Sequence, residues 1–334
     1  MGLVNLSELL KDAEERKYAV GGFVLVNLEW VKAVAEAAKR KLSPLSLCVA
    51  QVHFDFVDME ALAPAIHQAA KELPVPVAVH LDHGKSIDAI MRAIKCGFTS
   101  VMFDGSDLPF EENVEMTKRI VDFAHSVGVS VEAELGAVGG GYGKAEGGEA
   151  PPPELLTDPL QAAEFVRRTN CDALAVAIGT VHGKYKGKPK LDFERLKRIR
   201  ELTNVPLVLH GGSGIPPEDV KKAIELGVRK INIYYDMQRL ATERIRALVN
   251  RDGDSVTYPD IMNACKEGVR EAVEFYMDVF GSTGKCATPS HLCKNCQACA
   301  HARDASVSPS FTDEELAKRI AKIVADVLKG GISQ

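Results

Sequence analysis

Apolar and polar positions repeat along the chain in one order, in which a short apolar run is followed by a longer amphipathic stretch. The short runs predict strands at residues 19–25, 45–50, 75–81, 100–103, 129–134, 173–178, 206–210 and 230–233. The amphipathic stretches predict helices, for example at residues 28–41, 87–96, 111–127, 159–168, 193–202 and 218–226. Eight strands alternating with helices predict the α/β class and a (β/α)8 TIM barrel.

The predicted barrel domain covers residues 1–280 and is followed by a C-terminal extension. Additional helices are expected at 3–18, before the first strand, and at 238–250 and 258–279, after the last strand. A glycine- and proline-rich loop at 136–153 follows the fifth strand. Loops of this length are usually active-site lids or disordered insertions, and its position favours a lid.

Chemically active residues stand at the carboxyl ends of five of the predicted strands. They are Asp82, His83, Asp104, Glu134, His182 and His210. The carboxyl ends of barrel strands meet at one face, so these residues are expected to form a single site. A doubly wound sheet is the alternative fold, but it does not readily gather residues from strand ends spread over the whole chain.

Three histidines and a carboxylate among these residues suit a divalent metal ion. Neutral imidazoles of His83, His182 and His210 with Glu134 favour Zn²⁺ or a similar ion. The alternative is that each histidine makes only its own local hydrogen bond. Asp82 is the expected general base. Because neighbours in a strand point to opposite faces, either Asp82 or His83 must lie where the strand pleat breaks.

Two further carboxylates, and the glycine-rich or polar segments after the seventh and eighth strands, complete the predicted site. Asp104 and Glu132 are expected to support the metal ligands, to bind another cation, or to be structural. Residues 210–214 and 232–236 follow the seventh and eighth strands, where barrels often bind phosphate through backbone N–H groups. The helix that starts after Pro216 has a dipole that would favour an anion there.

The composition limits the kinds of molecule that the protein is expected to bind. A net charge of −5 provides no basic surface for nucleic acid or an acidic membrane. No apolar run approaches the roughly 20 residues needed to cross a bilayer, and the acidic N-terminal stretch lacks a signal-peptide pattern. We therefore expect a cytoplasmic protein with a small-molecule partner.

The C-terminal extension divides into a polar segment at 281–311 and a helix at 312–330. Four cysteines crowd into the polar segment, namely Cys286, Cys293, Cys296 and Cys299. Such spacing suits Zn²⁺ or an iron–sulfur cluster, and the alternative is surface cysteines without metal. A capping box at 312–315 predicts the start of an amphipathic helix, which packs on the barrel or a neighbouring subunit or docks onto a partner protein.

At these motifs the chain resembles the class II, metal-dependent ketose-bisphosphate aldolases over about residues 3–280. The motifs are VHLDH (79–83), SVMFD (100–104), VEAELG (131–136), AIGTVHG (177–183), LVLHGGSG (207–214) and KINI (230–233). The resemblance implies that zinc, bound by His83, His182 and His210, polarises a ketone and stabilises an enediolate. It makes Glu134 an associated metal-site carboxylate, Asp82 the proton-transfer residue and Asp104 part of a second or alternative metal position.

The same resemblance indicates which residues would bind the dihydroxyacetone phosphate half of the substrate. Its binding residues would be Gly183, Gly211, Ser213 and Asn232, with Lys186 nearby. Tyr235 departs from the family pattern, but its hydroxyl group is expected to reach the same phosphate. It also implies a sugar-phosphate substrate, a homodimer or homotetramer, and a monovalent cation as a candidate additional cofactor.

The chain departs from the family pattern at several positions, one of them where a second phosphate would bind. Val24 replaces an asparagine, Ala50 replaces a serine, and Tyr234 and Tyr235 replace smaller residues after the eighth strand. Asp260 stands in place of an arginine that the family uses, across the dimer, for the distal phosphate. In the lid, Gly141 and Tyr142 stand where acidic residues are usual, and Glu146 or Glu149 would substitute for them.

These departures predict that the metal chemistry is kept and the substrate is changed. We expect a metal-dependent aldolase with dihydroxyacetone phosphate as donor that is not optimised for a bisphosphate. The alternatives are another metal-dependent lyase or epimerase with a different donor, and a non-enzymatic binding protein on the same barrel. The intact Asp82, His83, Glu134, His182 and His210 argue against the last of these.

Overall fold

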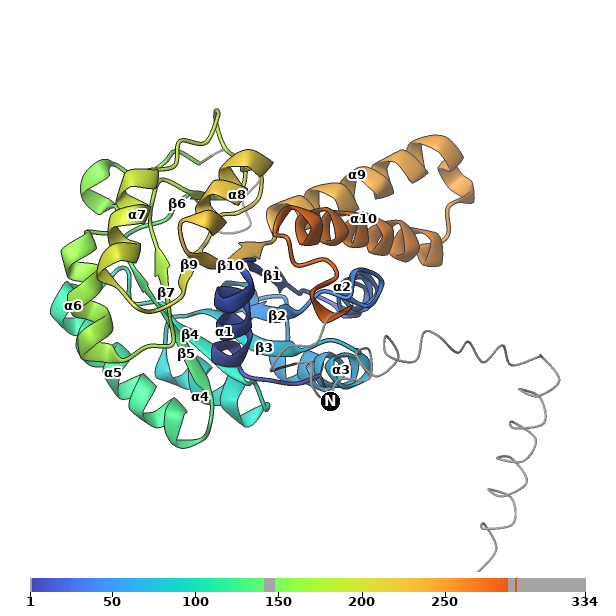
Figure 1. Ribbon diagram of the computed structural model, residues 1–334. Coiled ribbons are helices and arrows are strands. Elements are labelled where there is room, and N and C mark those ends of the chain that lie inside the picture. Colours follow the sequence, from blue (N-terminus) through green and yellow to red (C-terminus); the bar gives the residue numbers. More distant parts are fainter. Residues whose placement is uncertain (1, 141–147, 288–291, 293–334) are drawn as a thin grey trace, which may run out of the picture. The chain divides into compact units, whose positions relative to one another are not determined.

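Eight parallel strands close into a barrel in the computed structural model, which describes residues 2–140, 148–287 and 292 (Figure 1). The strands lie in the order β1-β10-β9-β7-β5-β4-β3-β2. Their bounds are β1 Val20–Val24, β2 Leu45–Ala50, β3 Val77–Gly84, β4 Ser100–Phe103, β5 Ser130–Leu135, β7 Ala173–Val176, β9 Leu207–Leu209 and β10 Val228–Ile233. The predicted (β/α)8 barrel is confirmed, with strand bounds that shift by a few residues.

Helices surround the barrel and connect its strands. They are α1 Leu6–Arg16, α2 Leu28–Lys41, α3 Met59–Glu72, α4 Ile87–Lys95, α5 Phe110–Ser126, α6 Pro159–Thr169, α7 Phe193–Leu202, α8 Pro217–Glu225, α9 Tyr235–Asp252 and α10 Tyr258–Val279. Side chains of Asn27, Asp58, Ser86 and Asp158 accept backbone N–H bonds at the starts of α2, α3, α4 and α6. These caps satisfy donors that a helix leaves without partners, and they fix where each helix begins.

Helix α1 closes the amino-terminal end of the barrel. Its first turn carries a capping box between Asn5 and Glu8. Leu6, Leu9 and Leu10 are fully buried and pack against side chains inside the barrel, among them those of Ala78, Met102, Ala173 and Val208. With this end filled by apolar side chains, the opposite, carboxyl end of the strands is the one at which a polar site forms.

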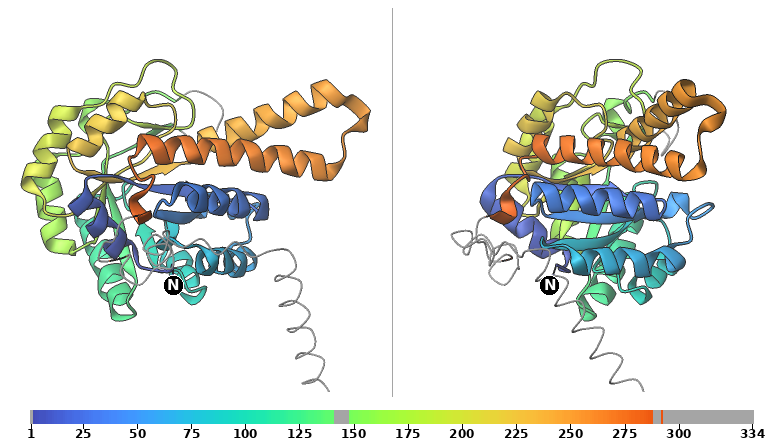
Figure 2. Two further views of the ribbon diagram at one scale, coloured as in Figure 1. Left: turned by 45° about the vertical axis from the view of Figure 1, so that its right-hand side comes forward. Right: turned by 90° about the vertical axis from the view of Figure 1, so that its right-hand side faces the viewer.

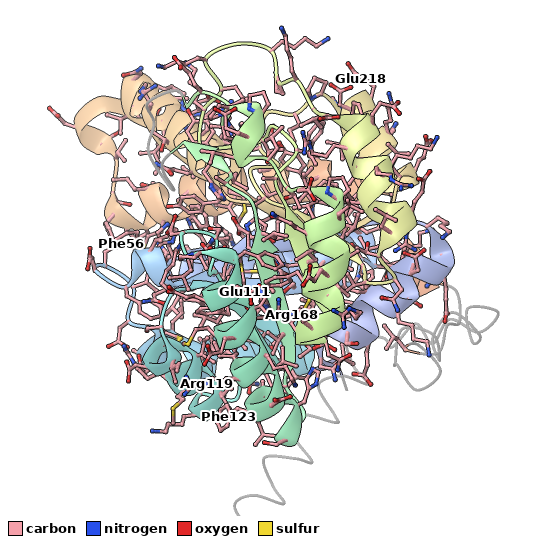
Figure 3. All side chains as sticks on the ribbon, turned by 90° about the vertical axis from the view of Figure 1, so that its left-hand side faces the viewer. Phe56, Glu111, Arg119, Phe123, Arg168 and Glu218 are labelled. Atoms are coloured by element: carbon pink, nitrogen blue, oxygen red, sulfur yellow. The ribbon has the colours of Figure 1, made fainter. Side chains whose placement is uncertain are left out.

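The outer helices pack in pairs. Arg168 of α6 forms an ion pair with Glu111 of α5, 2.7 Å apart, on the surface seen in Figure 3. Helices α9 and α10 form a long hairpin, joined by a short 3-10 turn, whose far end extends beyond the barrel (Figure 1, Figure 2). Helix α10 also lies against α2.

The loop after β5 is tied back to the loop after β7. Strand β6 (Gly139–Gly140) pairs in parallel with β8 (Val181–His182), and Gly148 bridges to Tyr185. Residues 141–147, including the predicted lid positions Gly141, Tyr142 and Glu146, lie outside the described residues. The two ends of the loop therefore frame the position of His182.

The chain divides into two compact units, Met1–Cys299 and Ala300–Gln334. The second unit, with the predicted helix at 312–330, lies outside the described residues. Within the described part of the chain, we find no helix with the length and hydrophobicity of a membrane span.

Candidate active site

The end of β3 places Asp82 and His83 side by side at the barrel mouth. His83 has φ of +48°, in the left-handed region that few residues other than glycine adopt. At this point the pairing of β3 with β4 shifts register between Leu81 and Gly84. The pleat break expected from sequence is therefore present, and both Asp82 and His83 are buried.

Three histidines from different strand exits converge on one point. His83 lies near the end of β3, His182 ends β8 and His210 follows β9. Their ring centroids are 4.5 to 5.9 Å apart. One nitrogen from each ring lies within 4.8 Å of the others, which is the arrangement expected of a three-histidine metal centre.

Carboxylates orient two of these rings. His83 Nδ1 bonds to Asp104 Oδ2 at 2.8 Å, and His210 Nε2 bonds to Glu132 Oε1 at 3.0 Å. The remaining nitrogens, His83 Nε2 and His210 Nδ1, face each other at 2.8 Å. Such carboxylate–histidine pairs fix the ring orientation and tautomer of metal ligands.

A buried lysine holds Glu132 in place. Lys230 Nζ donates to both oxygens of Glu132, at 2.8 and 3.1 Å, and both side chains are fully buried. His80 Nε2 lies 3.8 Å from the same carboxylate. Burial alone would raise the pKa of Glu132, but the charge of Lys230 and the bond from His210 lower it to about 2. Glu132 is therefore ionised and supports His210.

Asp104 and Glu134 form a second acidic group beside His83. Glu134 Oε2 lies 3.8 Å from His83 Nδ1, and oxygen atoms of both carboxylates can join His83 around a common ion. Burial and the charge of Asp104 raise the pKa of Glu134 well above its usual value. Lys85 Nζ lies 3.0 Å from Asp104. Two buried acids this close favour a cation between them.

The protonation of the histidines also fits a divalent cation. Burial, followed by the positive charge of His83, lowers the pKa of His182 and of His210, so both rings are neutral ligands. Burial would lower the pKa of His83 too, but Asp82, Asp104 and Glu134 raise it to about 9. His83 Nε2 and His210 Nδ1 are 2.8 Å apart, and a divalent cation bound by both rings would displace a proton shared between them.

Asp82 is held by an amide from across the barrel. Asn232 Nδ2 donates to Asp82 Oδ1 at 2.7 Å. Burial opposes ionisation, but the charges of His83, His210 and Lys230 hold the pKa of Asp82 below its usual range. Gly22 on the neighbouring β1 leaves room for this amide, because a Cβ there would collide with the Asn232 side chain.

Five of the six residues predicted to bind the donor meet at one recess beside His182. They are Gly183, Gly211, Ser213, Asn232 and Tyr235. Gly211 has φ of +67°, and a Cβ there would strike the backbone of Val181. The sixth, Lys186, is not part of this lining, and its ammonium pairs with Glu149 at 3.0 Å near the surface.

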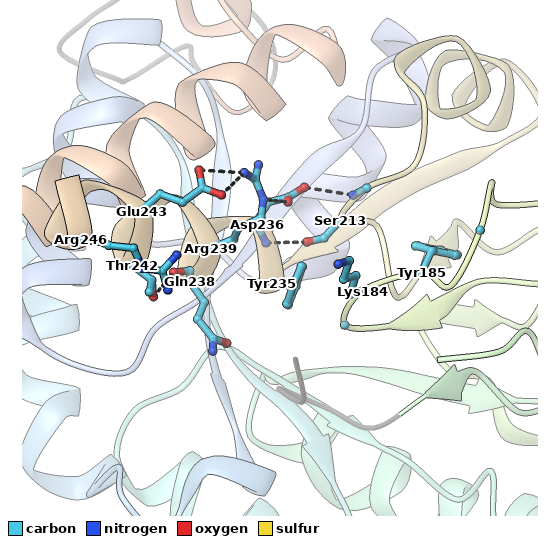
Figure 4. A pocket seen from close by; sticks show the side chains of 13 residues that line it. Lys184, Tyr185, Ser213, Tyr235, Asp236, Gln238, Arg239, Thr242, Glu243 and Arg246 are labelled. Atoms are coloured by element: carbon cyan, nitrogen blue, oxygen red, sulfur yellow. Dashed lines mark hydrogen bonds and ion pairs between the residues drawn. The ribbon is translucent and has the colours of Figure 1, made fainter. Parts of the chain in front are cut away.

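A wider cavity of about 710 Å³ opens next to the donor recess (Figure 4). Lys184 and Tyr185 line one side, and residues of α9 such as Arg239 and Arg246 line the other. Arg239 is already bound to Asp236 and Glu243, at 3.0 and 2.8 Å. The two hollows share Gly183, Ser213 and Tyr235, so they adjoin each other.

The side of the mouth at the ends of β1 and β2, next to β10, is apolar. Val24, Cys48 and Ala50 form a buried cluster, and Tyr234 packs against it. His53, which the sequence did not single out, is buried with its ring centroid 4.6 Å from that of Tyr234. His53 lies in a 3-10 turn (Gln51–His53) after β2, where no motif or apolar run marks it.

The predicted cysteine cluster is described only at Cys286. That residue is buried in a short turn (Lys285–Ala287) and packs in the main hydrophobic core. Cys293, Cys296 and Cys299 lie outside the described residues. Among the described residues, the groups arranged to hold a metal are those around His83.

A (β/α)8 barrel with three histidines and carboxylates at its mouth is the arrangement expected of a metal-dependent barrel enzyme. Residues 4–285 match the family model described as fructose-bisphosphate aldolase class-II. The chain is 43% identical over 290 residues to a fructose-bisphosphate aldolase of Geobacillus stearothermophilus, covering 86% of this chain and 100% of that one. It is 40% identical to the enzyme of that name from Staphylococcus aureus, over 85% of this chain and 99% of the relative.

The solved structures agree with this match. The crystal structure of the YdjI aldolase from Escherichia coli K12 aligns with a TM-score of 0.74 and 37% identity, covering 85% of this chain and 99% of that one. The chain therefore belongs to the class II fructose-bisphosphate aldolase family. It is a metal-dependent aldolase, and so a lyase, and the family implies a divalent metal ion such as Zn²⁺.

Proposed function

We propose that this aldolase makes and breaks the carbon–carbon bond of a ketose phosphate with dihydroxyacetone phosphate as donor. The observation that carries the proposal is the recess that Gly183, Gly211, Ser213 and Asn232 form beside His182. Backbone N–H groups and a serine at a helix start are the groups that hold a phosphate. Asp236 N–H, in the first turn of α9, bonds to Ser213 Oγ at 3.2 Å, which keeps the serine at that helix end.

His83, His182 and His210 would hold the metal ion, with Glu134 and Asp104 beside it. When bound, the ion supplies a Lewis acid for the ketone oxygen of the donor. Asp104 and Glu132 keep the imidazoles oriented, as their bonds of 2.8 and 3.0 Å to His83 and His210 indicate. Because these residues hold or orient the metal ligands, a separate group has to transfer the proton.

Asp82 is the proposed acid–base group. Its carboxylate is ionised and oriented by Asn232, so it is prepared to take a proton. In the condensation direction it removes a proton from the hydroxymethyl carbon of the donor and passes it to the aldehyde oxygen. In cleavage it takes the proton of the substrate hydroxyl group and returns it to the donor carbon.

We further propose that the enzyme is not adapted to a bisphosphate. Val24 and Ala50 supply no hydrogen bond donors from their side chains, and they lie in an apolar cluster with Cys48. Asp260 brings a negative charge, and its carboxylate is used to cap its own helix through the Thr257 backbone at 2.9 Å. A carboxylate repels a phosphate, whereas the arginine that it replaces would attract one.

Deuterium exchange at the hydroxymethyl carbon of dihydroxyacetone phosphate, followed by NMR, tests the donor and the acid–base group. Zinc-loaded protein is expected to exchange, and both the metal-free protein and Asp82→Asn are expected to lose exchange. No exchange by fully metallated wild-type protein would mean that the donor is different. Turnover of fructose 1,6-bisphosphate equal to that of fructose 1-phosphate or better would overturn the claim about the second phosphate.

A further inference from the structure

Aromatic rings line the part of the barrel mouth that lies beside the donor recess, at the ends of β1 and β2. The Tyr234 ring centroid is 5.6 Å from that of Trp30 and 4.6 Å from that of His53. His53 in turn lies 5.0 Å from Phe56. We call His53, Phe56 and Tyr234 the aromatic face, with Trp30 as its buried support.

The aromatic face adjoins the reacting centre. Tyr234 lines the donor recess together with His182 and Asn232, so the two surfaces are continuous. Ala50, next to the turn that carries His53, pairs directly with Asp82 in the barrel sheet. A substrate with its donor half in the recess would therefore extend its other half toward these rings.

The chemistry of this region suits an uncharged chain. Beneath the rings lie Val24, Cys48 and Ala50, which are fully buried and apolar. Burial lowers the pKa of His53 to about 4, against the opposing charge of Asp82, so its ring is neutral at neutral pH. A neutral ring stacks but provides no positive charge for a phosphate.

Phe56 gives the face an exposed outer end. Its side chain is 65% exposed, although it is a large apolar residue, and it projects from the surface in Figure 3. Ligand sites are lined mainly by apolar and aromatic side chains, with a few polar groups at fixed positions. Its contact with His53 makes this ring the continuation of the buried part of the face.

From this geometry we infer that the aromatic face binds the aldehyde half of the substrate, and that this half is an uncharged aldehyde with a hydrocarbon-like chain. The inference rests on the proposed function, since it takes the donor half to lie in the glycine-rich recess. The chain of such an aldehyde would pack across Tyr234 and His53 toward Phe56, while its carbonyl carbon meets the donor near Asp82.

The test measures condensation of dihydroxyacetone phosphate with hexanal and with glyceraldehyde 3-phosphate, by following loss of the donor. Wild-type enzyme is expected to have the higher kcat/KM with hexanal. Phe56→Ala is expected to raise the KM for hexanal by about three- to tenfold, the range of one aromatic contact. Phe123→Ala is the matched control, because Phe123 is 43% exposed and lies on α5, well away from Phe56 (Figure 3).

Two results would overturn the inference. One is a higher kcat/KM with glyceraldehyde 3-phosphate than with hexanal, and the other is the same KM for hexanal in Phe56→Ala and Phe123→Ala. Deuterium exchange into the donor by wild-type enzyme separates this failure from failure of the proposed function. If exchange occurs, only the aldehyde assignment falls, whereas absence of exchange removes the donor on which it rests.

Discussion

The two sides of the barrel mouth differ in how they are built. The proposed donor side, at the ends of β8, β9 and β10, consists of glycines, Ser213 and Asn232. The neighbouring side, at the ends of β1 and β2, consists of Val24, Ala50 and the aromatic face, of which Tyr234 also borders the donor recess. His182 of the histidine centre borders the donor recess, and Asp82 pairs with Ala50 of the other side.

Under the two proposals, the two halves of an aldol substrate would be recognised by separate means. Proton transfer and donor binding would depend on polar groups at fixed positions, which tolerate little change because a buried polar group without its partner costs about 1–3 kcal/mol. The aldehyde half depends on shape and apolar contact, where substitutions of similar volume are tolerated. A lineage can therefore change its aldehyde while it keeps the chemistry.

The largest expected effect on activity follows from replacing Asp82, the group proposed to transfer a proton between the two halves of the substrate. Asp82→Asn keeps the size of the side chain but removes its ability to accept a proton, so kcat should fall by about 10²–10⁴-fold. The measurement is kcat for cleavage of fructose 1-phosphate by zinc-loaded protein. Metal content must equal that of the wild type, since Asp82 is not proposed as a ligand. Retained activity would show that another group transfers the proton.

A large effect on stability is expected from the ion pair beneath the donor half. Lys230→Met leaves Glu132 buried without its cation, and breaking such a pair typically costs about 3–5 kcal/mol of unfolding free energy. Lys118→Met is the matched control, because Lys118 pairs with Asp122 on the exposed surface of α5. That change should cost at most about 1 kcal/mol.

Urea unfolding of both variants gives the two free energies. Equal losses in Lys230→Met and Lys118→Met would show that the buried pair contributes no more than a surface pair. A partial recovery of stability in the double variant Glu132→Gln with Lys230→Met would confirm that the lost charge balance is the cause, since it removes the isolated carboxylate.

The donor half was largely predictable from the sequence, and the aldehyde half was not. Apolar runs with polar exits located β3, β5 and β9, and glycine next to His182 and His210 marked positions where backbone must approach a ligand. The prediction that the pleat breaks between Asp82 and His83 is confirmed by the positive φ of His83.

Other features depend on tertiary contacts that leave no local pattern. His53 follows β2 within a short turn, and only the fold brings it to Tyr234, far along the chain. The bonds of Lys230 to Glu132 likewise join β10 to β5 across the barrel interior. Lys186 was assigned to the donor through its motif, but in the structure its ammonium group forms an ion pair with Glu149.

The smallest expected effect separates the two halves most directly. Ser213→Ala removes one hydroxyl group from the donor recess, worth about 0.5–1.5 kcal/mol, so the KM for dihydroxyacetone phosphate should rise about two- to tenfold. The KM for the aldehyde should stay the same, because Ser213 is not part of the aromatic face. Ser126→Ala, on the exposed end of α5, is the control for loss of a serine hydroxyl. Initial rates with each substrate varied in turn give both constants.

Ser213 also accepts a hydrogen bond from the Asp236 N–H at the start of α9. If the serine had only this structural role, Ser213→Ala would reduce stability and change both KM values together. A rise confined to the donor would instead show that the serine binds the phosphate half, and that the two halves are recognised independently.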